Sequence, residues 1–197
     1  MDLALFDFDG TITTGDTYTP FLSYISPAAF RRRAWRRLLW PWLGYKLGLV
    51  SGTAVRRQVT AHVLRGREVS AIRALGMRYA RERLPHVLRP EAMARLAWHR
   101  ERGDRIVVVS ASLDAYLAPW CRAHGLELIC SELESREGVL TGNYRGGDCA
   151  GAAKAARVRA HLRLEDYACV HAYGDTVEDR ELLALAHRPV YRWQAAA

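Results

Sequence analysis

Phe-Asp-Phe-Asp-Gly-Thr, at residues 6–11, closes an apolar run near the start of the chain. Side chains alternate in an extended segment, so Asp7 and Asp9 are expected to point to one side and the two phenylalanines to the other. Two carboxylates at one place repel each other unless a cation lies between them or one of them is protonated. Gly10 allows the backbone to turn and to approach a bound anion closely. The stretch therefore predicts either an acidic site at the end of a strand or a plain Asp-Gly turn.

Short apolar runs and helix-length segments alternate over much of the chain. The apolar runs cover residues 3–6, 106–109, 126–129 and 168–172. The helical segments cover residues 113–124, 150–162 and 177–186, with a predicted hairpin at 131–144 and a last short strand at 189–191. Most of the runs are too apolar to have a solvated face, which is typical of buried parallel strands. The alternation therefore predicts an α/β fold with a doubly wound parallel sheet.

One long part of the chain has no strand pattern. Between about residues 17 and 104, arginine-rich helical patterns follow one another. The points that break them are Pro41, Ser51-Gly52, Gly66 and Pro85. This part predicts a helical insertion between the first and second strands.

Charge is distributed unevenly along the 197 residues. Lys and Arg number 29 against 21 Asp and Glu, which gives a formal net charge of +8. Residues 31–105 alone hold 18 Arg and one Lys against five acids, a net of +14, which leaves −6 for the rest. A basic surface of this kind is expected to attract phosphates, nucleic acid or an anionic membrane. With 50% hydrophobic and 25% charged residues, the composition excludes a disordered, collagen-like or coiled-coil protein.

A second acidic stretch, residues 173–179, also lies between a predicted strand and a predicted helix. It places Asp175 and Asp179 at the carboxyl end of a strand, where open α/β sheets bind their ligands. We therefore expect these two acids beside Asp7 and Asp9. Four converging carboxylates favour a hard divalent cation, and Mg²⁺ with oxygen ligands matches best. The alternative for Asp179 is an ordinary acid in the first turn of a helix.

Two further side chains are candidates for contact with a phosphate. Ser110 follows the run 106–109, and its hydroxyl is expected at the same edge, with the backbone N–H groups of Ala111 and Ser112 opening the next helix. The alternative for Ser110 is a helix cap. Lys154 is one of two lysines in a chain with 27 arginines, which favours a place where a compact ammonium is needed. A solvated helix lysine is the alternative there.

The chain resembles the haloacid dehalogenase superfamily in the order and spacing of four motifs. These are Asp7-Phe8-Asp9-Gly10-Thr11, Ser110 after an apolar strand, Lys154, and Gly174-Asp175-x-x-x-Asp179. The insertion and the pattern Cys149-Ala150-Gly151-x-x-Lys154 are similar to subfamily IB, the branch that contains phosphoserine phosphatases. The resemblance implies a three-layer Rossmann-like core of residues 1–15 and 90–197, and a helical cap of residues 16–89 that determines substrate specificity.

The same resemblance implies a Mg²⁺-dependent phosphatase. Asp7 is then the nucleophile that forms an aspartyl-phosphate, and Asp9 is the acid for the leaving group and the base for water. Mg²⁺ is implied at Asp7, the backbone carbonyl of Asp9 and Asp175, with Asp179 supporting the lysine or metal-bound water. The residues implied to hold the phosphoryl group are Ser110, Ala111, Lys154 and Gly10.

Substrate identity depends on the implied cap, where the chain departs from phosphoserine phosphatases. Asp16 stands where those enzymes have a Glu that reads the ammonium group of the amino acid. An ungapped register puts Gln58 at their carboxylate-binding Arg, with Arg56 and Arg57 next to it. We therefore expect Asp16, Arg56 and Arg57 to contact a substrate that need not be phosphoserine.

Residues 26–42 predict an amphipathic helix of the implied cap. Ser26 and Pro27 fit its N-cap and first position, and arginines gather on one face while Phe, Trp and Leu side chains share the other. Basic residues beside tryptophans suit a membrane interface. The chain is also similar to the phosphatidylglycerophosphate phosphatases of this branch, which implies a lipid phosphate as substrate. The alternatives are a helix that packs within the cap, and a small metabolite such as phosphoserine, histidinol phosphate or a sugar phosphate.

The sequence also bears on location and partners. The N-terminus has no pattern of a secretory signal, and the longest apolar stretch, 38–50, is shorter than the ~20 residues that cross a bilayer. We expect a cytoplasmic protein, peripheral on the inner membrane surface if its substrate is a lipid. Four cysteines without a C-x-x-C pair are expected to be reduced and structural. A non-catalytic basic protein that binds nucleic acid or a membrane is the alternative from another class. No nucleic-acid motif accompanies the charge, so no nucleic-acid partner is expected.

Overall fold

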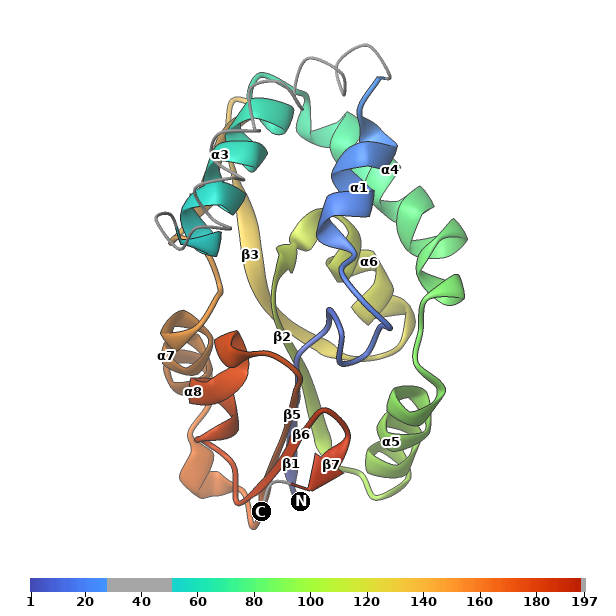
Figure 1. The fold of residues 1–197 in the computed structure, drawn as a ribbon, viewed down its shortest axis with the longest axis vertical. Coiled ribbons are helices and arrows are strands. Elements are labelled where there is room, and N and C mark those ends of the chain that lie inside the picture. The colour runs from blue at the N-terminus through green and yellow to red at the C-terminus, as the bar shows by residue number, and fades with distance from the viewer. Residues whose placement is uncertain (28–50, 196–197) are drawn as a thin grey trace.

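A seven-stranded sheet forms the centre of the computed structural model, which describes residues 1–27 and 51–195 (Figure 1). Its order is β4-β3-β2-β1-β5-β6-β7. The strands are β1 (Leu3–Phe6), β2 (Arg105–Leu113), β3 (Glu127–Arg136), β4 (Val139–Arg145), β5 (Val170–Gly174), β6 (Arg188–Tyr191) and β7 (Gln194–Ala195). The five strands from β3 to β6 in this order pair in parallel, whereas β4 and β7 add antiparallel edges. The predicted α/β class with a parallel sheet is confirmed.

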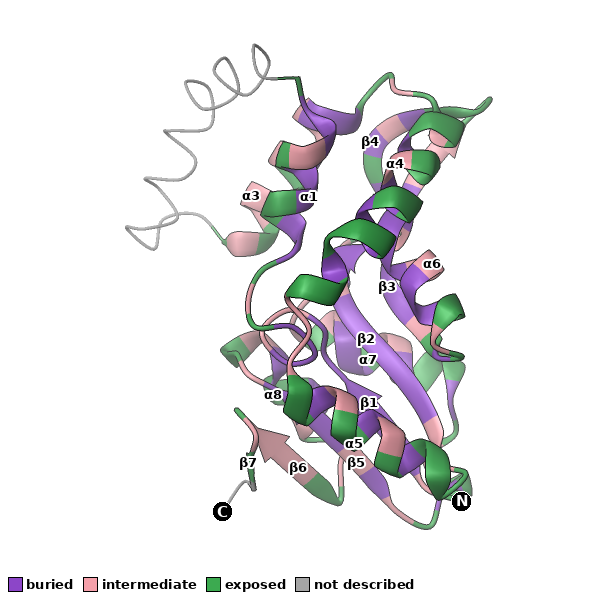
Figure 2. Ribbon diagram, turned by 90° about the vertical axis from the view of Figure 1, so that its right-hand side faces the viewer, coloured by how far each residue is buried: buried purple, intermediate pink, exposed green. Residues whose placement is uncertain are grey.

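Helices cover both faces of the sheet. On one face lie α5 (Pro90–Glu101) and α6 (Asp114–Ala123), and on the other α7 (Ala152–His161) and α8 (Arg180–Leu183) (Figure 1). Alternate residues of β1 feed two separate cores: Phe6 packs with the α5 and α6 side, and Leu5 with the α7 and α8 side. Figure 2 shows β1 and most of β2 buried. This three-layer arrangement is the Rossmann-like core that the resemblance implied.

Three elements differ from the sequence-based expectation. The predicted helix 177–186 is a 3₁₀ turn, Val177–Asp179, followed by the short α8, and Thr176 and Asp179 form a capping box at the start of this turn. The predicted strand at 126–129 and the first arm of the hairpin are one continuous strand, β3, which turns into β4 at Glu137 and Gly138. β7 was not predicted, because the turn before it uses Arg192 and Trp193 at positive φ rather than glycine.

β2 is also longer than expected. It continues through Ser110 to Leu113, and its pairing with β3 shifts register between these two residues. α6 begins only at Asp114. The expectation that Ala111 and Ser112 open a helix is therefore wrong, because the irregular pairing with β3 keeps this segment extended.

The predicted insertion consists of helices in its described part. These are α1 (Tyr18–Ile25), α3 (Gly52–Leu64), α4 (Val69–Glu82) and the 3₁₀ turn η1 (Leu84–His86), followed by α5. Ser51 caps α3, and Gly66 lies in the turn after it, as the predicted breaks indicated. Residues 28–42 of the predicted amphipathic helix lie outside the described residues. In the described ranges, no helix is both long enough and apolar enough to cross a bilayer.

The inserted helices α1, α3 and α4 lie beyond the carboxyl ends of the core strands (Figure 1). α3 packs against β4, and α4 packs against α6. A chain of buried hydroxyl groups ties three of these elements together: the Tyr18 hydroxyl lies 2.7 Å from Thr60 Oγ1, which lies 2.6 Å from the Tyr144 hydroxyl. α1 and α3 are thus fixed against the β3–β4 hairpin.

Gly76 allows the close packing of α4 on α6. A Cβ at this position would lie 2.0 Å from the backbone oxygen of Ala115, which belongs to α6 and cannot turn aside. We expect Gly76→Ala to lower the free energy of unfolding by about 1–3 kcal/mol, measured by urea denaturation. Gly15→Ala is the matched control, because a Cβ there meets nothing within 4 Å, and its change should stay within about 0.5 kcal/mol. Equal stability of the two variants would contradict this packing.

Candidate active site

The carboxyl ends of β2, β1 and β5 meet at one edge of the sheet. Phe6 pairs with Val108 on one side and with Tyr173 on the other, and the N–H of Asp7 donates to the Tyr173 carbonyl at 2.9 Å. Asp7 therefore lies between Ser110, two residues beyond Val108, and the acidic segment that follows β5. The three sequence motifs meet here because parallel strands end at the same edge.

Lys154 lies between two of the predicted carboxylates. It comes from the first turn of α7, and its Nζ donates to Asp7 Oδ1 and to Asp179 Oδ1, both at 2.5 Å. The side chain is only 3% exposed. Burial alone would lower the pKa of Lys154, but the two carboxylates outweigh it and raise the pKa. Burial raises the pKa of Asp7 to about 7, although Lys154 acts to lower it. The alternative of a solvated lysine is excluded.

Both carboxylate oxygens of Asp179 accept hydrogen bonds within the site. Its Oδ2 accepts hydrogen bonds from the backbone N–H groups of Asp175 and Thr176 at 3.1 and 3.0 Å, and from Thr176 Oγ1 at 3.1 Å. Its other oxygen binds Lys154. The absence of a side chain at Gly174 is necessary here, since a Cβ would lie 2.6 Å from the Cβ of Asp179. Asp179 therefore positions the lysine and the Asp175 loop.

Asp9 is surrounded by hydrogen-bond donors that the sequence did not reveal. Its Oδ1 accepts the Thr17 N–H at 2.7 Å and the Thr17 hydroxyl at 2.5 Å, and its Oδ2 accepts the Ser112 hydroxyl. The Tyr116 hydroxyl contacts that of Thr17 at 2.9 Å. Burial raises the pKa of Asp9, and the donors act against this shift. The donors hold one rotamer of Asp9, whereas burial favours its protonated form relative to an exposed acid.

Gly10 brings the first motif against the last. Its φ of +81° lies in the left-handed region, and a Cβ would meet Asp175 Oδ2 at 2.2 Å. Thr11 Oγ1 donates to Asp175 Oδ1 at 3.4 Å. The turn therefore needs glycine both for its backbone conformation and for the close approach of Asp175.

A large cavity opens over this cluster. Its volume is about 920 Å³, and it lies between the acidic edge and the inserted helices α1 and α3. Of the predicted residues, those that line it are Asp7, Asp9, Gly10, Asp16, Arg56, Ser110, Ala111, Lys154 and Asp175. Arg57 does not line it and is exposed, because it lies about 100° further around α3 than Arg56. A contact of Arg57 with the substrate stays a prediction that the cavity lining does not support.

Two of the three predicted cap contacts, Asp16 and Arg56, already have partners within the protein. Asp16 Oδ1 accepts the N–H of Tyr18 at 2.9 Å, so this carboxylate also starts α1. Arg56 crosses from α3 to the core, where its Nε donates to Asp148 and its terminal nitrogen to Glu178, each at 3.0 Å. Burial opposes the charge of Arg56, but these carboxylates outweigh it and raise the pKa of the guanidinium. Asp148 and Glu178 are site neighbours that the sequence analysis missed.

The similarity to known proteins identifies the family. A family model described as haloacid dehalogenase-like hydrolase matches residues 4–184. The chain belongs to this family. The match includes all four motifs and the insertion between the first two of them. The resemblance drawn from the motifs is therefore confirmed, and with it the expectation of a hydrolase.

Two relatives and two solved structures are similar to this haloacid dehalogenase-like hydrolase. Protein CicA of Caulobacter vibrioides (strain NA1000 / CB15N) is 32% identical over 200 residues, covering 96% of this chain and 85% of CicA. The histidinol-phosphatase of Neisseria meningitidis serogroup C (strain 8013) is 29% identical over 114 residues, covering 54% of this chain and 51% of that one. A Bordetella pertussis Tohama I protein of unknown function has a TM-score of 0.79 at 25% identity, covering 96% of this chain and 89% of that one. A probable phosphoserine phosphatase from Vibrio cholerae has a TM-score of 0.71 at 18% identity, covering 96% of this chain and 55% of that one.

The acidic edge of this family member has the composition of a site for a hard cation. Carboxylate oxygens of Asp7, Asp175 and Asp179 lie within 4.8 Å of one another. A single ammonium, from Lys154, faces these three negative charges, and burial raises the pKa of Asp175. Since the bonds of Asp179 are already used, Asp7 and Asp175 are the carboxylates left for a metal. Oxygen ligands with excess negative charge fit Mg²⁺.

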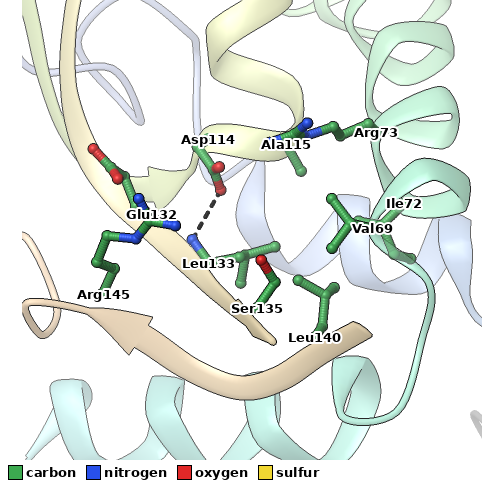
Figure 3. Close-up of a pocket in the computed structure, with 10 residues that line it drawn as sticks. All are labelled: Val69, Ile72, Arg73, Asp114, Ala115, Glu132, Leu133, Ser135, Leu140 and Arg145. Atoms are coloured by element: carbon green, nitrogen blue, oxygen red, sulfur yellow. Dashed lines mark hydrogen bonds between the residues drawn. The ribbon is translucent and has the colours of Figure 1, made fainter. Parts of the chain in front are cut away.

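A second, smaller cavity lies away from these carboxylates, among α4, α6, β3 and β4 (Figure 3). Its volume is about 90 Å³, and Asp114 at its wall accepts the N–H of Leu133 at 3.1 Å. Binding sites for small molecules generally have volumes of roughly 300–1,000 Å³. The large cavity over the hydrolase motifs is therefore the candidate substrate site.

Proposed function

We propose that the chain is a Mg²⁺-dependent phosphomonoester hydrolase that works through an aspartyl-phosphate. One observation carries this proposal. Asp7 is buried and paired with Lys154, Asp9 next to it is held by hydrogen bonds, and both acids line a large cavity. The similarity to a histidinol-phosphatase supports phosphomonoesters as the substrate class. Family membership alone is compatible with other hydrolytic reactions. Asp9, the second carboxylate, favours a reaction in which the leaving group needs a proton donor.

The first step uses Asp7 as nucleophile. One of its carboxylate oxygens forms a bond to phosphorus while the bond from phosphorus to the ester oxygen breaks. Asp9 donates its proton to the leaving alkoxide, so the alcohol leaves neutral. Burial, which raises the pKa of Asp9, supports this protonated state before reaction. Lys154 and Ser110 hold the phosphoryl oxygens, because phosphoryl transfer depends mainly on position and neutralised charge.

The second step reverses the role of Asp9. Its carboxylate takes a proton from the water that attacks phosphorus, and Asp7 leaves as a free carboxylate with phosphate as product. Asp7, the backbone carbonyl of Asp9 and Asp175 would hold Mg²⁺, which neutralises phosphoryl charge when bound. Asp179 keeps Lys154 in place through both steps.

We propose a lipid phosphate, such as phosphatidylglycerophosphate, as substrate. The part of the cavity formed by α1 and α3 includes four apolar side chains, Leu22, Val55, Val59 and Val63, beside polar ones such as Thr19, Ser23 and Arg56. An apolar body attached to the phosphomonoester would fill this part and displace water from it. Residues 16–89 then act as the specificity cap over a catalytic core of 1–15 and 90–197, and such a substrate would bring the enzyme to the inner membrane surface. A small metabolite phosphate is the alternative, which the similarity to a histidinol-phosphatase favours.

A phosphatase assay with a substrate panel tests this function. Phosphate release should require Mg²⁺, and removal of the metal with EDTA should lower it at least about 100-fold, with recovery when Mg²⁺ is added back. A lysophospholipid phosphate and phosphatidylglycerophosphate in detergent micelles should give a higher kcat/KM than phosphoserine, histidinol phosphate and sugar phosphates. Phosphate release that is insensitive to EDTA would contradict the metal, and no release from any substrate would contradict the phosphatase. A higher kcat/KM for the small metabolites would contradict the lipid substrate and support a small metabolite phosphate instead.

A further inference from the structure

Four cations line the large cavity, and they differ in how their charge is balanced. Lys154 contacts two carboxylates, and so does Arg56. Within residues 1–27 and 51–195, the other two, Arg89 and Arg192, form no ion pair with an acid. Among the described residues, these two guanidinium groups are therefore not paired directly with a carboxylate. An anionic group of a ligand would pair with either of them.

Arg89 lies where the chain re-enters the core from the inserted helices. Its backbone N–H donates to the Ile12 carbonyl at 2.9 Å, and the residue is the N-cap of α5. One terminal nitrogen of its guanidinium donates to the Gly10 carbonyl at 3.2 Å. Its Nε is buried and has no hydrogen-bond partner among the described residues. A buried donor without an acceptor is unfavourable, so an acceptor that reached this guanidinium would be bound favourably.

The contact of Arg89 also places it on a particular side of the site. Gly10, whose carbonyl it binds, is the residue after Asp9, the proposed donor of the proton to the leaving alcohol. Lys154 instead contacts Asp7 and Asp179. The guanidinium therefore contacts the turn that follows Asp9, and it lines the cavity there.

Arg192 is less suited to this role. Its side chain is exposed, its Nε donates to the Asp175 carbonyl at 3.1 Å, and its guanidinium lies 5.1 Å from the ring centre of Tyr191. A charge in contact with water is screened and loses binding energy, whereas a half-buried charge keeps more of it. Arg192 is thus the matched comparison for Arg89: a second cavity arginine without an acid partner, in a more solvated place.

We propose that Arg89 binds a second anionic group, carried by the leaving group of the phosphomonoester. The inference rests on the proposed phosphatase function and narrows its substrates to those with two anionic groups, such as a carboxylate or a phosphodiester next to the phosphomonoester. Arg89 is a specificity residue in this view. Its planar fork of donors matches either kind of oxyanion.

Binding of two matched probes tests the proposal without turnover. The probes are 2-phosphoglycerate and glycerol 2-phosphate, which differ by a carboxylate in place of a hydroxymethyl group. Calorimetry with Mg²⁺ present would use the full chain with Asp7→Asn, which lacks the proposed nucleophile. We expect this parent to bind 2-phosphoglycerate about tenfold or more tightly than glycerol 2-phosphate, since a charge-assisted contact is lost with the second probe. Adding Arg89→Gln should abolish this preference, Arg89→Lys should keep part of it, and Arg192→Gln should keep most of it.

Three results would overturn the role of Arg89. They are the absence of any preference in the parent, an unchanged preference in Arg89→Gln, and an equal loss in Arg192→Gln, which would show that only the total charge of the cavity matters. If the role of Arg89 were purely structural, Arg89→Gln would weaken the binding of both probes equally. Arg89→Lys keeps the positive charge, so it shows whether charge at this position is sufficient for the preference. Failure of the phosphatase function is a separate result, because it would be the absence of turnover in the unmodified chain, whatever the probes bind.

Discussion

Asp7→Asn should lower kcat for hydrolysis of p-nitrophenyl phosphate by at least about 10³-fold, because the amide cannot replace the carboxylate as nucleophile. The two side chains have nearly the same shape, and the amide oxygen still accepts a hydrogen bond from Lys154. Lys154 also keeps its contact with Asp179. We therefore expect the variant to fold, with a circular dichroism spectrum like that of the unmodified chain. Steady-state phosphate release measures the effect.

Asp166→Asn is the matched control for this change. Asp166 is an exposed acid in the 3₁₀ turn Leu164–Asp166, and its side chain is 58% exposed. Removal of its charge should leave kcat within about twofold, because a surface charge of this kind contributes little. A folded Asp7→Asn variant that keeps its activity would remove Asp7 from the reaction, and an equal loss in both variants would point to an effect of net charge.

Lys154→Met should have the largest effect on stability. Lys154 is the ammonium between the buried carboxylates of Asp7 and Asp179, and methionine fills a similar volume without charge. The two acids would then face each other without a cation, and breaking a buried ion pair in this way costs about 3–5 kcal/mol. We expect the free energy of unfolding to fall by that amount, measured by urea denaturation without added metal, and phosphate release to be lost as well.

A second substitution shows whether the loss of stability in Lys154→Met comes from the unpaired carboxylates or from poorer packing. In the double variant Lys154→Met with Asp179→Asn, one of the two unbalanced carboxylates is gone, so part of the stability should return. Activity should remain lost, because the phosphoryl group still lacks its ammonium. If the double variant is less stable than Lys154→Met alone, the cost comes from packing and the charge argument is wrong.

The catalytic edge could be predicted because its residues lie at ends of strands. Asp7 and Asp175 follow apolar runs, and runs of this type form parallel strands whose carboxyl ends meet. Lys154 was marked by its rarity among arginines, and its place between Asp7 and Asp179 agrees with the expected need for a compact ammonium. For these residues, the local sequence pattern and the general topology of parallel sheets were sufficient to predict their place in the structure.

The donors around Asp9 could not be found in the same way. Ser112, 103 residues away, reaches Asp9 only because β2 runs past Ser110, and Thr17 reaches it through the turn that starts α1. Arg89 gave no signal among so many arginines, since its role depends on the Gly10 carbonyl across the fold. Each of these contacts depends on tertiary geometry and not on spacing in the sequence.

The central claim is that phosphate passes through Asp7. Its most direct test is a rapid-quench experiment with excess substrate and Mg²⁺, followed by proteolysis in acid and mass spectrometry of the peptide that contains residues 6–11. We predict that this peptide carries one phosphoryl group, located on Asp7, at a level that rises and then falls as substrate is consumed. Rapid turnover with the phosphoryl group on another residue, or with an Asp7 peptide that never becomes phosphorylated at any quench time, would contradict the account.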